Sequence, residues 1–172
     1  TPHLRRELMK AETYKARLKF LQENSISTAD DLTACMHQAE STVTQLAKQR
    51  TILNVRKKKR KKLFDALAAE EALAMSKALY EEGLSGMESE YAQYVEAKAT
   101  LDTCGISRQA LTEEKADIYE QLAQLNKQIR AERKKIKLCR EIADSAAKMQ
   151  QDIAVQEKSQ QEKEASQTRD YK

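Results

Sequence analysis

Long stretches of this sequence place an apolar residue at every third or fourth position, and very little interrupts them. In the last third of the chain, the residues on this spacing are Ile118, Leu122, Leu125, Ile129, Ile136 and Cys139. Such spacing puts side chains on one stripe of an α-helix. The 172 residues include only three glycines and one proline, too few for the many turns of a β-sandwich or an α/β fold. The sequence therefore predicts an all-α fold.

Three short segments end the helices that this spacing defines. At Gly83 and Gly105, glycine can adopt the left-handed conformation that closes a helix. The apolar residue that follows each glycine, Leu84 or Ile106, would fold back on the last helical turn. A third stop is expected around residues 24–25, where the same apolar spacing occurs without glycine. These stops divide the chain into four helical segments.

Each stop is followed by a serine that can cap the next helix. Ser27 and Ser85 each have an acidic residue three positions later, Asp30 and Glu88, which is the capping-box pattern. Ser107 is a third expected cap, without the acidic partner. We therefore expect helices at 3–23, 28–82, 86–103 and 107–160. At ~1.5 Å per residue, the second and fourth would each be about 80 Å long, as in elongated, coiled-coil-like helical hairpins.

Two halves of the sequence resemble each other. Four residues of the first half share their order and spacing with four of the second: Tyr14, Leu21, Ile26 and Ser27 with Tyr94, Leu101, Ile106 and Ser107. We expect two repeats of a short helix, a turn and a long helix, at 1–83 and 84–155, followed by a polar, frayed tail at 156–172. Each short helix would bury its stripe on a long one. Low-complexity helical sequence can imitate such a duplication, so both readings stay open.

The sharpest local feature is a run of seven consecutive cations, Arg56–Lys62, here called the basic turn. When the apolar seam of the second helix is extended, Lys57 and Arg60 occupy seam positions. Lysine and arginine are not left buried without partners. The basic turn is therefore expected to be solvated, kinked or held against anions.

A second basic segment, 130–140, follows at the matching place of the second repeat and keeps Ile129 and Ile136 on its seam. Lysines and arginines along a helix can bind the phosphate backbone of nucleic acid without reading bases. The competing interpretation is a solvated charge run that keeps a long helix soluble. The candidate nucleic-acid-binding residues are Arg56, Lys57, Lys58, Lys59, Arg60, Lys61, Lys62, Arg130, Arg133, Lys134, Lys135, Lys137 and Arg140.

Nothing in the sequence indicates a catalytic site, a metal, a cofactor or a small-molecule substrate. His3 and His37 are isolated, and Cys35, Cys104 and Cys139 have no C-x-x-C spacing. An odd number of such cysteines suggests free, packed thiols in a reducing compartment. No apolar run reaches the roughly 18 residues of a membrane span, and no signal-peptide pattern occurs. We expect a cytoplasmic, non-enzymatic protein that does not bind membranes; its first residues, Thr1-Pro2, suggest a piece of a longer chain.

Several segments resemble a known family. These are YKARLKFLQEN at 14–24, LDTCGIS at 101–107, LNKQIR at 125–130 and KLCREI at 137–142. They are similar to the helical C-terminal region of relaxases, the mobilisation proteins of conjugative and mobilisable elements in Gram-positive bacteria. The resemblance runs from about Leu4 to Ile153. It implies a cytosolic bacterial protein concerned with DNA mobilisation. The family's nuclease domain uses a tyrosine and a histidine-bound metal, but this chain has no His-x-His, so no catalytic residue is carried over.

Two functions follow as alternatives. In the first, the chain is a relaxase accessory region whose basic segments hold DNA backbone and which also contacts other mobilisation proteins. In the second, it is a structural module without a nucleic-acid role, which associates with itself through uncovered apolar stripe. The residues expected to be uncovered are Phe64, Leu67, Leu138 and Ile142. Binding to an anionic membrane is disfavoured because the cationic run lacks a strongly hydrophobic opposite face.

Overall fold

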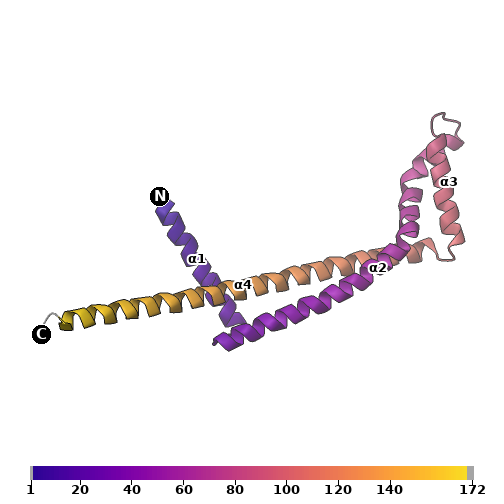
Figure 1. Cartoon of the computed structure of the whole chain (residues 1–172). Coiled ribbons are helices and arrows are strands. Elements are labelled where there is room, and N and C mark those ends of the chain that lie inside the picture. The colour runs from indigo at the N-terminus through magenta and orange to yellow at the C-terminus, as the bar shows by residue number, and fades with distance from the viewer. Residues whose placement is uncertain (1, 170–172) are drawn as a thin grey trace. The chain divides into compact units, whose positions relative to one another are not determined.

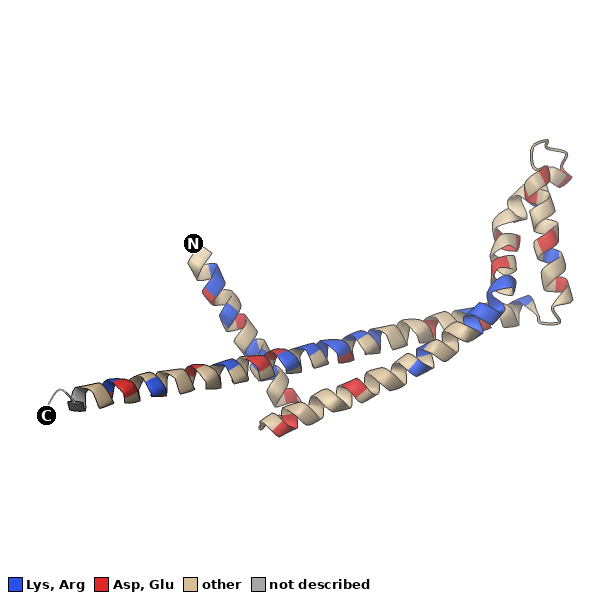
Figure 2. Ribbon diagram, in the orientation of Figure 1, with Lys and Arg blue, Asp and Glu red and all other residues tan. Residues whose placement is uncertain are grey.

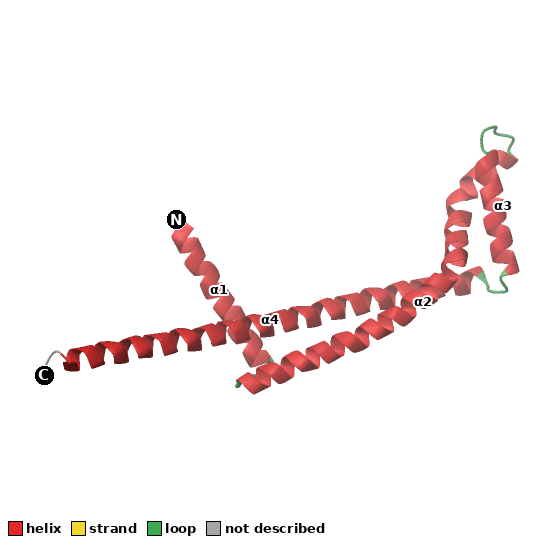
Figure 3. Cartoon of the chain, viewed as in Figure 1, coloured by secondary structure: helices red, strands yellow, loops and turns green. Residues whose placement is uncertain are grey.

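The structure is a computed structural model that describes residues 2–169. Over that range the chain forms four α-helices and no strand (Figures 1 and 3), so the predicted all-α fold is confirmed. The helices are α1 (Pro2–Glu23), α2 (Ala29–Glu81), α3 (Glu88–Thr103) and α4 (Arg108–Arg169). The segment expected as a frayed tail, 156–172, is helical as far as Arg169, beyond the predicted end at residue 160; its last three residues lie outside the described part.

Contacts divide the chain into two compact units. Unit 1 comprises Thr1–Thr44 and Arg130–Lys172, and unit 2 comprises Gln45–Ile129. The two long helices, α2 and α4, contribute residues to both units. Each unit therefore combines parts of both predicted repeats, and the duplication itself stays a prediction.

Unit 2 holds the better-packed core. Its buried residues come from three helices: Phe64 and Ala66 of α2, Ala97 and Leu101 of α3, and Leu111, Ile118 and Leu122 of α4. Here the short helix does fold back on the long ones (Figure 1). The expectation that Phe64 is left uncovered was wrong, because α3 and the start of α4 cover it; its side chain is only 4% exposed. Leu67 is half-buried against the same cluster.

Unit 1 packs more thinly. Leu32 and Ala39 of α2 and Ile136 and Cys139 of α4 are buried, and Leu138 and Ile142 are half-buried rather than uncovered. The helix α1 crosses α4 (Figure 1), where Arg17 Nη1 donates a hydrogen bond to Ser145 Oγ at 2.9 Å.

The stripe of α1 is not buried, contrary to expectation. No residue of α1, which is described over its whole length, is buried. The large apolar side chains concerned are Leu4, Leu8, Met9, Tyr14 and Leu18, which are 56–68% exposed. A crossing contact covers only the residues near the crossing point, whereas the fold-back seen for α3 covers a whole stripe. The outer turns of α1 therefore present apolar surface to solvent.

Two of the predicted helix ends have the full hydrogen-bond pattern of a Schellman cap. After α2, Gly83 has a φ of +88°, the Gly83 N–H bonds to Tyr80 O at 2.9 Å, and the Leu84 N–H bonds to Leu79 O at 3.0 Å. After α1, Ser25 adopts a φ of +54°, and the Ile26 N–H bonds to Leu21 O at 2.9 Å. The stop predicted without glycine is thus confirmed, with serine in the left-handed conformation.

The end of α3 differs in detail. Gly105 has the expected positive φ of +73°. The Leu101 carbonyl, however, accepts from the Cys104 N–H at 3.4 Å instead of from Ile106, and the Cys104 Sγ lies 3.0 Å from the same oxygen. The thiol thus competes for the carbonyl that a Schellman cap would use, and Ile106 contributes by packing on the core of unit 2.

Two of the three predicted helix starts are corrected. The cap of α2 is Thr28 with Asp31, one residue later than the predicted Ser27 and Asp30. The Asp31 N–H bonds to Thr28 Oγ1 at 3.1 Å, and the Asp31 carboxylate accepts from the N–H groups of Ser27 and Thr28. Both residue pairs satisfy the capping-box spacing, so spacing alone does not choose between them.

The start of α3 lies later than predicted from Ser85. Gly86 has a φ of +93°, which a right-handed helix does not accommodate. The helix α3 therefore begins only at Glu88. The residue before it, Met87, makes no side-chain capping bond. The third start is confirmed: the Ala110 N–H bonds to Ser107 Oγ at 3.1 Å.

The Thr28 cap gives a first prediction. Thr28→Ala removes the side-chain acceptor of one orphan N–H, and we expect a loss of about 1 kcal/mol in the free energy of unfolding, measured by urea denaturation followed by circular dichroism. Thr33→Ala is the matched control, because Thr33 Oγ1 donates only to Ala29 O within the helix. Equal losses for both variants would contradict the cap.

The same cap makes the start of α2 sensitive to acid. Hydrogen bonds from the backbone of Ser27, from the Thr28 side chain and from the Thr28 backbone lower the pKa of Asp31 below its usual 3.8. The ionised carboxylate is thus favoured in the folded state. Its stabilising effect is present above pH 3.8 and is lost as the pH falls through the lowered pKa.

Candidate nucleic-acid interface

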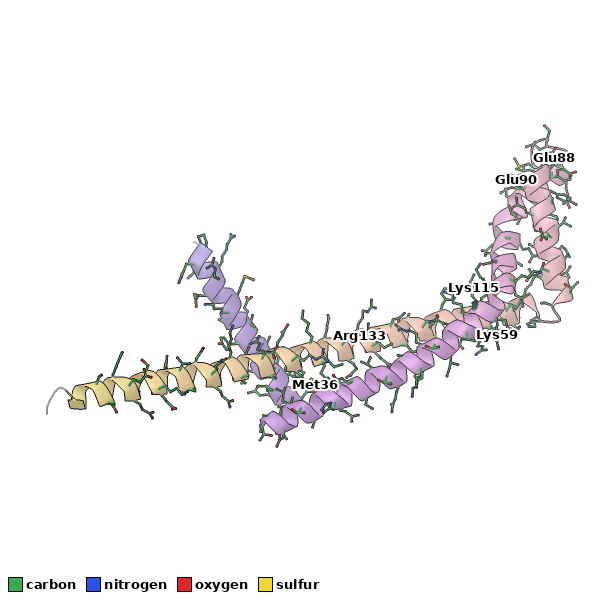
Figure 4. All side chains as sticks on the ribbon, viewed as in Figure 1. Met36, Lys59, Glu88, Glu90, Lys115 and Arg133 are labelled. Carbon is green, nitrogen blue, oxygen red and sulfur yellow. The ribbon has the colours of Figure 1, made fainter. Side chains whose placement is uncertain are left out.

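The helix α2 bends within the basic turn. Figure 2 shows the cations gathered at this bend, and Figure 4 places Lys59 there. No proline or glycine occurs between residues 29 and 81, so the usual backbone causes of a kink are missing. The bend coincides with two changes: Lys57 and Arg60 interrupt the apolar seam, and α2 goes on to pack against α3, where Tyr80 stacks on Tyr91 at 4.2 Å between ring centroids.

Both seam cations are half-buried and have partners. Arg60 Nε lies 3.2 Å from Glu114 Oε2, and Arg56 Nη2 lies 3.0 Å from Glu114 Oε1. Lys57 Nζ lies over the ring of Tyr119, 4.4 Å from its centroid. The arginine at a seam position is thus neutralised by a carboxylate that is itself only 14% exposed. The lysine ammonium lies against an aromatic face, which attracts it but leaves its charge uncancelled. Of the three alternatives expected for the basic turn, solvated, kinked or held against anions, the structure shows the bend and, for Arg60, contact with a carboxylate.

The other four cations of the basic turn are exposed. Lys61 forms an ion pair with Asp65, four residues along the same helix, which raises the pKa of Lys61. Lys58, Lys59 and Lys62 are exposed, and within residues 2–169 no carboxylate pairs with them. Lys62 lies three and four residues after the other two, so the three ammonium groups share one helix face. We call these three residues the free lysine set.

The second basic segment belongs to unit 1 and shows a similar division. Three of its cations have carboxylate partners: Arg140 with Glu40 at 3.0 Å, Lys135 with Glu132 at 3.6 Å and Lys137 with Glu141 at 3.8 Å. Ile129 and Ile136 are buried, as predicted.

The remaining three cations of this segment, Arg130, Arg133 and Lys134, are exposed and have no ion pair with any described residue. Figure 4 labels Arg133 on α4. Arg133 and Lys134 follow Arg130 by three and four residues, so these cations also share one helix face. Each basic segment therefore leaves three like charges together without compensation.

Glu114 and Tyr119 are the site residues that sequence reasoning missed. Both lie on α4 opposite the basic turn, and neither belongs to the apolar stripe of that helix. The sequence carries no local signal for them, because their place depends on the antiparallel register of the hairpin, which only the structure shows. Arg50 Nη1 donates to Asn126 Oδ1 at 3.2 Å, and Arg108 binds Glu70 with Nε 2.6 Å from Oε2. Once these two pairs fix the register, Glu114 and Tyr119 fall beside Arg60 and Lys57.

The described residues include no group of three or more histidine, cysteine or acidic side chains placed to hold a metal ion. His37 Nδ1 lies 3.3 Å from Glu40 Oε2. All three cysteines are free thiols, as predicted. Burial, together with the neighbouring Cys35, raises the pKa of Cys139 to about 11, which keeps this thiol protonated at neutral pH. Among residues 2–169 no helix has the length and apolar character needed to cross a bilayer.

Comparison of the chain with protein-family models, with curated proteins and with solved structures finds no match.

Proposed function

We propose that this chain is a non-catalytic helical module that binds the phosphate backbone of DNA. The observation that carries the proposal is the free lysine set, three exposed ammonium groups on one face of α2 without a partner among the described residues. The set formed by Arg130, Arg133 and Lys134 supports it in the same way. The resemblance of segments such as 14–24 and 101–107 to relaxases favours a cytoplasmic role in DNA mobilisation, alongside other mobilisation proteins.

Charge repulsion explains why an anion suits these faces. Like charges three or four residues apart destabilise a helix by about 0.2–0.5 kcal/mol per pair. Apart from Lys57, which lies over the Tyr119 ring, the other cations of both basic segments, outside these faces, have a carboxylate partner, as two arginines do in Glu114. The free lysine set lacks one and keeps its repulsion. A row of phosphates relieves it and releases the counterions condensed on the nucleic acid.

The test is a salt titration of binding to a labelled duplex, followed by fluorescence anisotropy. Neutralising three phosphates predicts a slope of log affinity against log salt of about −2.7, and six phosphates about −5.4. A slope near zero, or no binding at low salt, would overturn the proposal.

The exposed stripe of α1 favours a second candidate function, self-association. The helix α1 has no buried residue, so it lacks the packing of an apolar face from which most helical stability in proteins comes. A second copy packed on Leu4, Leu8 and Leu18 would supply that packing. This function is compatible with DNA binding, since the stripe and the free lysine set lie on different helices.

Sedimentation checks the second candidate. We expect the mass of the wild-type chain to rise with concentration, and the double variant Leu8→Gln/Leu18→Gln to remain a monomer at every concentration. Ile52→Gln is the control, since Ile52 is also exposed, at 68%, but lies in unit 2. A wild-type chain that stays monomeric at high concentration would rule out this function.

A further inference from the structure

We propose that unit 2 contains a seat for one phosphate group, in the hollow between the basic turn and Tyr119. The inference rests on the proposed function and goes further, because it replaces a diffuse charged face by a defined subsite. The hollow has a volume of about 380 Å³ and is lined by residues of both α2 and α4.

Five of the seven residues that line the hollow carry a side-chain hydrogen-bond donor. They are three lysines, Lys57, Lys58 and Lys61, together with Asn54 and Tyr119. Neither Asn54 nor Tyr119 has a hydrogen-bond partner among the described side chains, so their donors are available. Because three lysines and two uncharged donors around one hollow match the acceptor-only oxygens of a phosphate, the hollow suits that group.

Two further residues that line the hollow affect how strongly it binds a phosphate. Phe64 lines the hollow and is 4% exposed, so one wall is apolar and lowers the local dielectric, which strengthens each charge interaction. Asp65 supplies the one carboxylate of the lining and is engaged by Lys61. That pair joins side chains that are 71% and 63% exposed, and pairs of this kind contribute little. An entering phosphate can therefore share Lys61.

The size of the hollow indicates which kind of phosphate compound fits it. Sites for small ligands span about 300–1,000 Å³, and this hollow lies at the lower end of that range. It has room for a phosphate with a sugar attached, as in one backbone nucleotide. The aromatic ring is already covered by Lys57 on one face, so Tyr119 contributes chiefly through its hydroxyl group.

The experiment uses the full chain and two variants with a control. Tyr119→Phe keeps the ring under Lys57 and removes only the hydroxyl group; we expect about tenfold weaker binding of a labelled oligonucleotide, the effect of losing one hydrogen bond to a charged group. Asn54→Asp places a negative charge in the hollow and should weaken binding more than tenfold. Gln45→Glu is the matched control, an equal charge change on the exposed part of α2, about 13 Å along the helix axis and beyond the Debye length.

The outcomes separate this inference from the proposed function. If Tyr119→Phe binds the oligonucleotide like the wild type and Asn54→Asp behaves like Gln45→Glu, the seat does not exist, although the salt-dependent binding of DNA can still stand. Calorimetry with pyrophosphate adds a second arm. If the wild-type chain binds pyrophosphate and Tyr119→Phe binds it more weakly, the seat also accepts free phosphorylated molecules. If that reduction occurs while no oligonucleotide binds, the seat stands and the proposed function fails.

Discussion

The variant Leu111→Ala is expected to lose about 3 kcal/mol of unfolding free energy. Leu111 is completely buried, in the cluster where α2, α3 and the start of α4 meet. Removing a buried leucine side chain costs its transfer free energy and leaves a cavity that the surroundings fill only in part, which together amount to about 2–5 kcal/mol. Three helices converge on Leu111, so no single helix can shift to close the gap without losing contacts to the other two.

Urea denaturation measures this effect, with the slope against denaturant unchanged. Met75→Ala is the matched control, because Met75 lies on α2 in the same unit and is 71% exposed; its unfolding free energy should stay within about 0.5 kcal/mol of the wild type. Leu111→Met, which nearly conserves volume, should lose less than about 1.5 kcal/mol. Equal losses for Leu111→Ala and Met75→Ala would show that the cluster does not hold unit 2 together.

The features that sequence predicted well are those that a few neighbouring residues determine. The buried stripe of α4, including Ile118 and Ile129, follows from its spacing alone. The stop at Gly83 follows from the freedom of glycine at positive φ and from the apolar residues on either side. Such local patterns need no knowledge of distant partners. They suffice to predict the all-α fold.

The features that sequence could not predict depend on which helices meet. The stripes of α1 and α3 look alike, yet Leu101 is 2% exposed and Leu18 is 58% exposed. Burial depends on a partner that the stripe does not specify. The pairing of Arg60 with Glu114 likewise requires the register of α2 on α4. The spacing rule for a capping box is also satisfied twice, so it did not distinguish Thr28 from Ser27.

The residues of the candidate site also divide into those that the sequence identifies and those that depend on which helices meet. Sequence identified all thirteen cations, because a charge run is visible in the chain itself. It could not separate the cations that carboxylates neutralise from those left free, since two of those carboxylates, Glu114 and Glu40, lie on another helix. Glu114, 54 residues from Arg60, is the clearest case. The structure therefore reduces the candidates in the basic turn to the free lysine set and the residues around Tyr119.

The triple variant Lys58→Gln/Lys59→Gln/Lys62→Gln is expected to bind duplex DNA about 10- to 100-fold more weakly at low salt. Removing the free lysine set removes up to three phosphate contacts, so the salt slope should become shallower by about 2.7. Glutamine keeps a long polar side chain and a good helix propensity, and these lysines are exposed. The helix content, measured by circular dichroism, should therefore stay unchanged.

The control must separate a local effect from one of net charge. Lys48→Gln/Lys127→Gln/Lys158→Gln lowers the net charge of +4 by the same three units at scattered exposed positions. If both triple variants bind equally weakly, long-range attraction accounts for the affinity and no lysine set is specific. Glu114→Gln should have the opposite effect on DNA binding, because it frees Arg56 and Arg60 from their shared carboxylate. Two added phosphate contacts should steepen the slope by about 1.8. Because Glu114→Gln also raises the net charge by one, a net-charge effect alone would change the affinity in the same direction. The scattered triple variant is therefore the deciding comparison, since it changes the net charge as much as the loss of the free lysine set does but away from the bend, and the Debye length of about 10 Å limits each local effect to its own surroundings.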